Sequence, residues 1–169
     1  MATNLELKAR IPSLRGAHQC ARLLGAEFHG LLVQRDTYFR VPAGRPKLRE
    51  CEGHKAELIY YEREESSSER WSNYRREAVD NAAGVRELLG EALGVRAVVD
   101  KRREVYLYGN ARIHIDDVSG VGACIEFEVM GEEPEESHGT MRTLVKAFLI
   151  DEGDIIRGSY SDLIQGKTY

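Results

Sequence analysis

The stretch of sequence that decides the fold runs from residue 4 to residue 10 and reads Asn-Leu-Glu-Leu-Lys-Ala-Arg. Polar and charged side chains occupy every second position, with leucine, leucine and alanine between them. A period of two residues is typical of a β-strand, whose successive side chains point to opposite faces. The stretch therefore predicts a strand with one apolar face and one charged face. Taken alone, the charged face is best explained by exposure to solvent.

Seven further segments have the composition or the alternation of strands. They cover residues 31–41, 47–49, 56–63, 70–79, 95–108, 112–118 and 124–130. Most of them follow one another through turns rather than helices, which favours an antiparallel sheet. With eight strands, closure into a barrel is geometrically natural. We therefore expect an α+β protein dominated by β structure, in which a closed eight-stranded antiparallel barrel has helices packed outside it.

Apolar stripes at helical spacing predict the helices. Ser13 can cap a helix that ends at Gly25, and Asn81 can cap a second helix that ends near Gly94. A third helix begins at the acidic residues between 132 and 136, because negative charge is favourable at a helix N-terminus. Its predicted buried side carries Met141, Leu144, Val145, Phe148 and Leu149. A short last helix includes residues 162–164.

The composition limits the class of protein. The 169 residues, 42% of them hydrophobic, suit a single domain that spans residues 1–169. A net charge of −4 argues against a general nucleic-acid binder. We expect a cytoplasmic protein that binds no membrane, since no apolar run is long enough to span one and the N-terminus lacks the pattern of a secretory signal. Three distant cysteines without a CxxC spacing disfavour a disulfide framework or a thiolate zinc site.

The charged faces of the predicted strands fall into two sets. The basic set contains Lys8, Arg10, Lys47, Arg49, Lys101, Arg103 and Arg112. The acidic set contains Glu6, Asp116, Glu126 and Glu128. Each of these residues alternates with apolar or neutral neighbours, so that the strands repeat the pattern of the first one.

Glu126 and Glu128 are the most informative pair. Two carboxylates on one face of a strand are about 7 Å apart and repel each other unless a cation lies between them. A hard divalent ion, Mg²⁺ or Mn²⁺, accepts such oxygen ligands and keeps open positions for a phosphate. The lysines and arginines would then bind the remaining phosphate oxygens.

The alternative is that these charges form exposed salt bridges between neighbouring strands. If the charges faced outward, the leucine, isoleucine and valine faces would fill the barrel. If they faced inward, helices would have to cover the apolar faces outside. The apolar stripes of the predicted helices favour the inward arrangement without deciding between the two.

Several motifs together resemble those of the CYTH superfamily, also called triphosphate tunnel metalloenzymes. In chain order they are Glu6-Leu7-Lys8, residues 34–39 (Gln-Arg-Asp-Thr-Tyr-Phe), Lys47-Leu48-Arg49, Lys101-Arg102-Arg103, residues 112–116 (Arg-Ile-His-Ile-Asp), Gly120-Val121-Gly122 and Glu126-Phe127-Glu128. Residues 158–164, which read Gly-Ser-Tyr-Ser-Asp-Leu-Ile, resemble the ending of the class IV adenylyl cyclase branch. The resemblance extends over nearly the whole chain.

The resemblance implies a barrel that forms a tunnel, in which carboxylates bind a divalent metal and basic residues bind a triphosphate. The implied metal ligands are Glu6, Asp116, Glu126 and Glu128, and Glu6 and Lys8 are the implied catalytic residues. The implied substrate-binding residues are Lys8, Lys47, Arg49, Lys101, Arg103 and Arg112, with Arg63 and Arg75 as further candidates.

Two positions depart from the family pattern. The family signature is Glu-x-Glu-x-Lys, and this chain has Asn4 in place of the first acid. On the fourth strand the family commonly has a lysine where this chain places Glu62, with Arg63 beside it.

The implied activity is that of a class IV adenylyl cyclase, which converts ATP to cyclic AMP and pyrophosphate with Mg²⁺ or Mn²⁺. One alternative is a triphosphatase that releases orthophosphate from inorganic tripolyphosphate or thiamine triphosphate. Another, motivated by Asn4, is a non-catalytic module that binds polyphosphate or nucleotides. The sequence leaves open whether the protein is a monomer or a homodimer.

Overall fold

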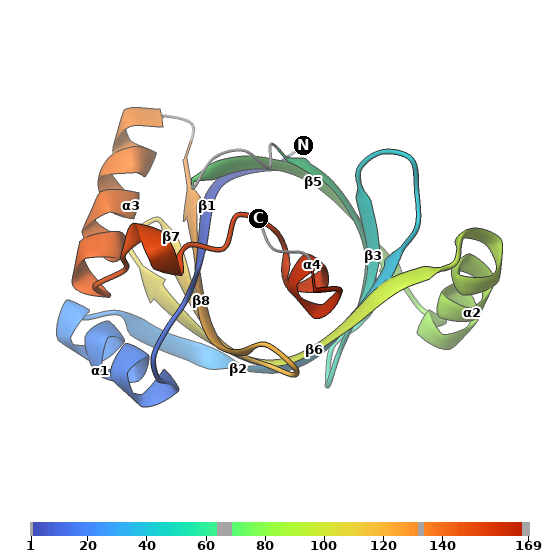
Figure 1. Cartoon of the computed structure of the whole chain (residues 1–169), viewed down its shortest axis with the longest axis horizontal. Helices are drawn as coiled ribbons and strands as arrows, with labels where there is room; N and C mark the ends of the chain where they lie inside the picture. Colours follow the sequence, from blue (N-terminus) through green and yellow to red (C-terminus); the bar gives the residue numbers. More distant parts are fainter. Residues whose placement is uncertain (1, 64–68, 132–133, 167–169) are drawn as a thin grey trace.

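An antiparallel sheet of eight strands forms the centre of the fold in the computed structural model, which describes residues 2–63, 69–131 and 134–166. The strands are β1 (Ala2–Arg10), β2 (Glu27–Phe39), β3 (Arg45–Cys51), β4 (Ala56–Arg63), β5 (Arg70–Val79), β6 (Val95–Tyr108), β7 (Ala111–Val118) and β8 (Gly122–Met130). Because β1 pairs with both β5 and β8, the sheet closes on itself in the order β1-β5-β4-β3-β2-β6-β7-β8 (Figure 1). The prediction of eight antiparallel strands is confirmed, although β2 and β3 are longer than predicted.

Four α-helices lie between or after the strands of the described chain. They are α1 (Leu14–Leu24), α2 (Ala82–Leu93), α3 (Pro134–Ala147) and α4 (Tyr160–Ile164), and a 3-10 turn covers Glu152–Asp154. The Ser13 hydroxyl accepts a hydrogen bond from the amide of Gly16, and Gly25 ends α1 in the left-handed conformation. Asn81 caps α2 in the same way. No helix in the described ranges has the length and apolar character needed to span a membrane.

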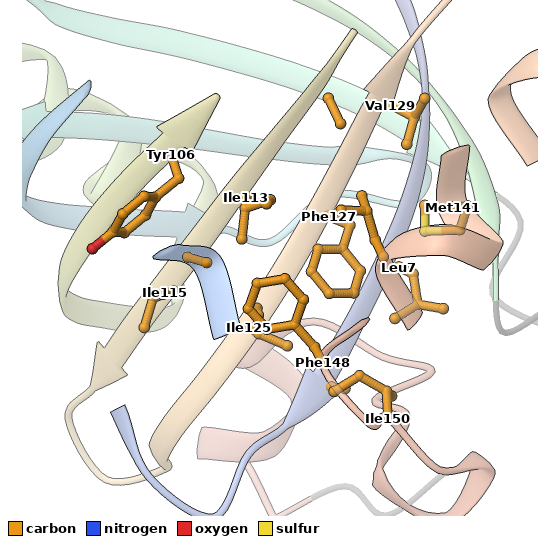
Figure 2. Packing of buried hydrophobic residues seen from close by; sticks show 14 of the residues in the cluster. Leu7, Tyr106, Ile113, Ile115, Ile125, Phe127, Val129, Met141, Phe148 and Ile150 are labelled. Carbon is orange, nitrogen blue, oxygen red and sulfur yellow. The ribbon is translucent and has the colours of Figure 1, made fainter. Parts of the chain in front are cut away.

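The main hydrophobic core lies outside the barrel, where α1 and α3 cover β1, β7 and β8 (Figures 1 and 2). Leu7 and Phe127 point outward from neighbouring strands and pack with Met141 of α3 and with Phe148, whose ring centroid is 5.3 Å from that of Phe127. Each such buried side chain contributes about 1.5–3 kcal/mol. Since the apolar faces of these strands point outward, their charged faces point into the barrel.

The end of the predicted α3 stripe differs from expectation. Leu149 was expected to be buried, but it is 80% exposed. The helix ends at Ala147, and Leu149 has a positive φ of 54°, so the chain turns before Leu149 can reach the core. Ile150, one residue later, is buried in that core instead.

A second apolar cluster lies inside the barrel and joins α4 to the strands. Tyr38, Tyr61, Val99 and Val118 of the strands pack with Tyr160 of α4. This explains why Figure 1 shows α4 within the outline of the ring of strands. The C-terminal segment therefore covers one part of the barrel interior.

Candidate functional site

The barrel encloses a cavity with a volume of about 570 Å³. All eight strands and the start of α4 contribute to its lining. The predicted site residues that line it are Glu6, Lys8, Lys47, Arg49, Lys101, Arg103, Arg112, Glu126 and Glu128. Most members of both charge sets are thus brought together in one cavity, which Asn4 lines too, whereas Arg10 and Asp116 do not line it.

The fifth strand requires a correction. Arg75 was predicted to bind substrate, but it is exposed and does not line the cavity, whereas the next residue, Arg76, does. The register explains this, because Arg76 lies opposite the inward-facing Ile59 and Arg75 lies opposite Tyr60. Arg63 ends β4, but its side chain lies outside the described part of the structure.

Asp116 is the one predicted metal ligand that lies outside the lining of the cavity. It is completely buried and does not line the cavity. Its carboxylate accepts two hydrogen bonds from Arg103, at 2.8 and 2.7 Å, and one from the Tyr160 hydroxyl at 2.8 Å. Burial alone would raise the pKa of Asp116, but Arg103 and Lys101 lower it below its usual value. Asp116 is therefore an ionised acceptor that orients Arg103.

A candidate metal site lies on β7 and β8. One ligand atom from each of His114, Glu126 and Glu128 lies within 4.8 Å of the other two. Within the described ranges of the chain, the buried His114 Nδ1 has no hydrogen-bond partner, and it lies 3.6 Å from Glu126 Oε2 and 3.9 Å from Glu128 Oε1. The two carboxylates fit a hard divalent cation such as Mn²⁺ or Mg²⁺, whereas the imidazole nitrogen beside them is a ligand more usual for transition metals. His114 was not among the predicted site residues, because its proximity to Glu126 becomes evident only in the fold.

Glu126 connects the metal site to the basic residues. It accepts hydrogen bonds from Lys8 Nζ at 2.6 Å and from Arg103 Nη2 at 2.5 Å. Burial would raise the pKa of Glu126, but Lys8 and Arg103 outweigh that effect and hold the pKa well below its usual value. On the neighbouring strand β1, Lys8 lies opposite Glu126 and Glu6 lies opposite Glu128. Four functional candidates thus meet where β1 pairs with β8.

Asp36 of β2 organises a second group of cations. Its buried carboxylate accepts two hydrogen bonds from Arg49, at 2.8 and 2.7 Å, and one from Lys47 at 3.0 Å. Lys101 Nζ lies 3.8 Å from the same carboxylate. This role of Asp36 was not predicted, because residues 31–41 were assigned only as a strand. The sequence did contain a signal for it, because Asp36 occupies one of the alternate positions of its strand whose side chains point into the barrel.

Lys101 has the most unusual titration behaviour in the cavity. Burial and the neighbouring Arg103 lower its pKa to about 7, although Asp36 acts in the opposite direction. The ammonium group of Lys101 is therefore only partly protonated near neutral pH. A bound anion would favour its protonated form.

Tyr160 of α4 is a further cavity residue that the sequence analysis did not assign. Its hydroxyl donates to Asp116, and its ring centroid lies 4.7 Å from Lys8 Nζ and 5.4 Å from Lys101 Nζ. Both lysines are placed for cation–π interaction with the ring. The signal that could have identified Tyr160 is its position inside the motif at residues 158–164.

Known proteins share both the sequence pattern and the fold. The CYTH domain family matches residues 2–160, and no curated protein sequence matches the chain. The PH1012 protein of Pyrococcus horikoshii has a similar structure, with a TM-score of 0.88 and 26% identity over 95% of this chain and 99% of that one.

Two more distant structures show the same fold. A proposed adenylate cyclase from Vibrio parahaemolyticus has a TM-score of 0.77 and 18% identity over 97% of this chain and 98% of that one. A proposed adenylyl cyclase from Hippeastrum, which has a dominant triphosphatase activity, has a TM-score of 0.71 and 17% identity over 98% and 97%. The family match extends over nearly the whole chain and agrees with the motifs in the sequence. The chain therefore belongs to the CYTH domain family.

Proposed function

We propose that this protein is a divalent-metal-dependent enzyme that cleaves a phosphoanhydride bond of a triphosphate inside the barrel. The observation that carries the proposal is the shared carboxylate of Glu126. It belongs to the candidate metal site and also binds Lys8 and Arg103. A phosphate near Glu126 would thus be within reach of both a metal ion and fixed cations.

The residues of the cavity suit phosphoryl or nucleotidyl transfer. Such reactions depend mainly on positioning and on charge neutralisation. Arg103 is oriented by Asp116, and Lys47 and Arg49 are oriented by Asp36, so these cations need little rearrangement to bind phosphate oxygens. Lys8 and Arg103 both contact Glu126 of the metal site, and either can donate to an oxygen that becomes more negative during the reaction.

His114, Glu126 and Glu128 would hold the metal ion, with Glu6 on the adjacent strand. When bound, Mg²⁺ or Mn²⁺ would neutralise negative charge on phosphate oxygens. Asn4 is 6% exposed and lies in the cavity at the position of the missing acid, where it supplies an amide instead of a charge.

Two reactions fit this site, and they differ in the bond that breaks. In an adenylyl cyclase the ribose 3′-hydroxyl of ATP attacks the α-phosphorus and pyrophosphate leaves. In a triphosphatase a water molecule attacks the terminal phosphorus and orthophosphate leaves. The cyclase is favoured by the resemblance of residues 158–164 to the ending of the class IV adenylyl cyclase branch, and the triphosphatase is favoured by the activity of the structurally similar Hippeastrum protein.

Product analysis tests the proposal directly. The purified protein is incubated with ATP, tripolyphosphate or thiamine triphosphate, each with Mg²⁺ or Mn²⁺. Cyclic AMP and pyrophosphate identify a cyclase, and orthophosphate identifies a triphosphatase. Binding without turnover under every condition would show a non-catalytic module and would contradict the proposal.

A double substitution tests the metal site. We expect Glu126→Gln with Glu128→Gln to abolish turnover, because both metal-binding carboxylates become neutral. The matched control is Glu77→Gln, at an exposed position of β5. Turnover is measured over a range of metal concentrations, and circular dichroism checks that the fold is kept. Full activity of the folded double variant would exclude this metal site.

A further inference from the structure

One tyrosine from outside the barrel strands contacts the charged centre of the cavity. Tyr160 begins α4, is 4% exposed and lines the cavity. The hydrogen bonds of Asp162 join α4 to β3 and β6, so the side chain of Tyr160 is held inside the barrel. It contacts side chains of three different strands, namely Lys8 of β1, Lys101 of β6 and Asp116 of β7.

Three hydrogen bonds in series connect the Tyr160 hydroxyl to the candidate metal site. The hydroxyl donates to Asp116 Oδ2 at 2.8 Å, and the same oxygen accepts a hydrogen bond from Arg103 Nη2 at 2.7 Å. Arg103 Nη2 in turn donates to Glu126 Oε2 at 2.5 Å. The guanidinium of Arg103 is therefore held between two carboxylates, and Tyr160 contacts one of them.

The Tyr160 hydroxyl helps to fix the carboxylate that orients Arg103. Asp116 is completely buried, and its carboxylate accepts the bond from Tyr160 in addition to two bonds from Arg103. A buried carboxylate that loses a donor costs free energy unless it moves toward its remaining donors. Loss of the hydroxyl would consequently displace Asp116, and Arg103 would move with it.

The aromatic ring of Tyr160 contacts two lysines of the cavity. Its centroid lies 4.7 Å from Lys8 Nζ and 5.4 Å from Lys101 Nζ, within the range of cation–π interactions. Lys8 belongs to β1 and Lys101 to β6, and these two strands are not neighbours in the barrel. The ring is thus placed to hold cations from two separate parts of the cavity wall.

We propose that Tyr160 is a positioning residue for the reaction inside the barrel, whose hydroxyl holds Arg103 toward Glu126 through Asp116. This inference rests on the proposed function and adds a residue of the C-terminal segment to it. Phosphoryl transfer depends on how closely charged groups are placed around the phosphate. A small displacement of Arg103 therefore slows the reaction more than it weakens binding.

The first test removes the hydroxyl alone. Tyr160→Phe keeps the ring and loses the hydrogen bond to Asp116. The matched control is Tyr106→Phe, which removes the same atom from a tyrosine that is also buried but belongs to the core outside the barrel. The constants kcat and KM are measured with tripolyphosphate and with ATP, each with Mg²⁺ or Mn²⁺. Thermal unfolding shows that each variant is folded.

We expect Tyr160→Phe to lower kcat by about tenfold or more, because Arg103 leaves the position that the reaction requires. KM should change by less than about twofold, since every cation of the cavity keeps its charge. Tyr106→Phe should leave both constants unchanged. If Tyr160 served stability alone, Tyr160→Phe would lower Tm and leave the kcat of the folded protein unchanged.

A second measurement follows Arg103 directly and needs no turnover. The Nε–H group of Arg103 donates to Asp116 at 2.8 Å, and the Arg103 side chain is 5% exposed. Its nuclear magnetic resonance signal should therefore exchange slowly with solvent, and the signal is assigned by its absence in Arg103→Lys. We expect Tyr160→Phe to shift this signal and to speed its exchange, and Tyr106→Phe to leave it unchanged.

Three results would overturn the inference, and they can be told apart. An unchanged kcat in Tyr160→Phe would show that the hydroxyl does not position the reacting groups. An unchanged Arg103 signal would show that the hydroxyl does not act through Arg103, and in both of these cases the proposed function stands. If the unmodified protein turns over no triphosphate, the proposed function itself fails and the inference fails with it, whatever the Arg103 signal shows.

Discussion

Asp36 lies completely buried among three cations that line the cavity. A carboxylate in this position has two effects. It compensates the cost of burying positive charge, and it fixes Lys47 and Arg49 in place before a ligand arrives. The affinity of the cavity for a triphosphate thus depends on a residue of the same charge sign as the ligand.

We expect Asp36→Asn to lower the free energy of unfolding by about 3–5 kcal/mol, because buried cations lose their partner. Urea denaturation of the whole protein measures this change. Asp100→Asn is the control, since Asp100 forms an exposed pair with Arg35 and its loss should cost only about 0–1 kcal/mol. Equal losses in the two variants would show that Asp36 does not hold the buried cations.

The titration of Lys101 predicts how binding depends on pH. Because the pKa of Lys101 is about 7, the protonated form that binds phosphate predominates below this pH and is lost as the pH rises above it. The affinity for tripolyphosphate should therefore fall with increasing pH above about 7, by up to about tenfold per pH unit. In Lys101→Arg the guanidinium stays charged, so this part of the pH dependence should disappear. A profile that is identical in the two proteins would exclude Lys101 from phosphate binding.

The sequence predicted most of the charged cavity residues because alternation along a strand is visible without a structure. Arg75 was wrong by one position, because the register of β5 against β4 determines which side of the strand faces inward. The roles of Asp36, Tyr160 and His114 depend on contacts between residues distant in the chain. The alternation of a strand and the position in a motif marked Asp36 and Tyr160, but neither pattern shows which residues they contact.

At the scale of elements, α4 joins the end of the chain to the barrel. Asp162 is buried and accepts hydrogen bonds from the Ser159 amide and hydroxyl, from Arg45 of β3 and from Arg96 of β6. A helix of five residues has little stability of its own, so these bonds and the packing of Tyr160 hold it in place. The position of Tyr160 in the cavity consequently depends on Asp162.

Asp162→Asn should release α4 from the strands. We expect faster amide hydrogen exchange in residues 159–165 and a loss of about 3–5 kcal/mol in the free energy of unfolding, since two arginines lose a buried partner. Glu152→Gln, in an exposed pair with Arg157, is the control and should change neither quantity appreciably. Unchanged hydrogen exchange in Asp162→Asn would mean that packing alone fixes α4.

The bounds of most elements could be predicted, whereas the direction of their faces could not. Ser13, Gly25 and Asn81 marked helix ends through local chemistry that does not depend on the rest of the fold. A strand with one apolar and one charged face is compatible with either face inside a barrel. The hydrophobic core that α1 and α3 form on the outside of the barrel determines the direction, because it requires the apolar faces of the strands to point outward.

At the scale of the whole molecule, residues of every strand line the cavity, so a ligand bound there would stabilise the folded barrel over the unfolded chain. We expect tripolyphosphate with Mg²⁺ at about 100 times its dissociation constant to stabilise the protein by about 2.7 kcal/mol. For a chain of this size that corresponds to a rise in Tm of about 5–11 °C. Differential scanning calorimetry measures the shift, and orthophosphate at the same concentration is the control. An equal shift with orthophosphate would show general anion binding rather than recognition of a triphosphate.

The pairing of β1 with β8 also has a consequence for the order of folding. It joins residues that are far apart in the chain, since Glu126 follows Lys8 by 118 positions. Contacts of such large sequence separation require the closure of a long loop and are expected to form slowly. Lys8 and Glu6 meet Glu126 and Glu128 only through this pairing, so a nascent chain that has folded its local hairpins still lacks the centre of the site. Because His114, Glu126 and Glu128 lie on the local hairpin of β7 and β8, it is the approach of Lys8 to Glu126 during refolding that would report the moment at which the barrel closes.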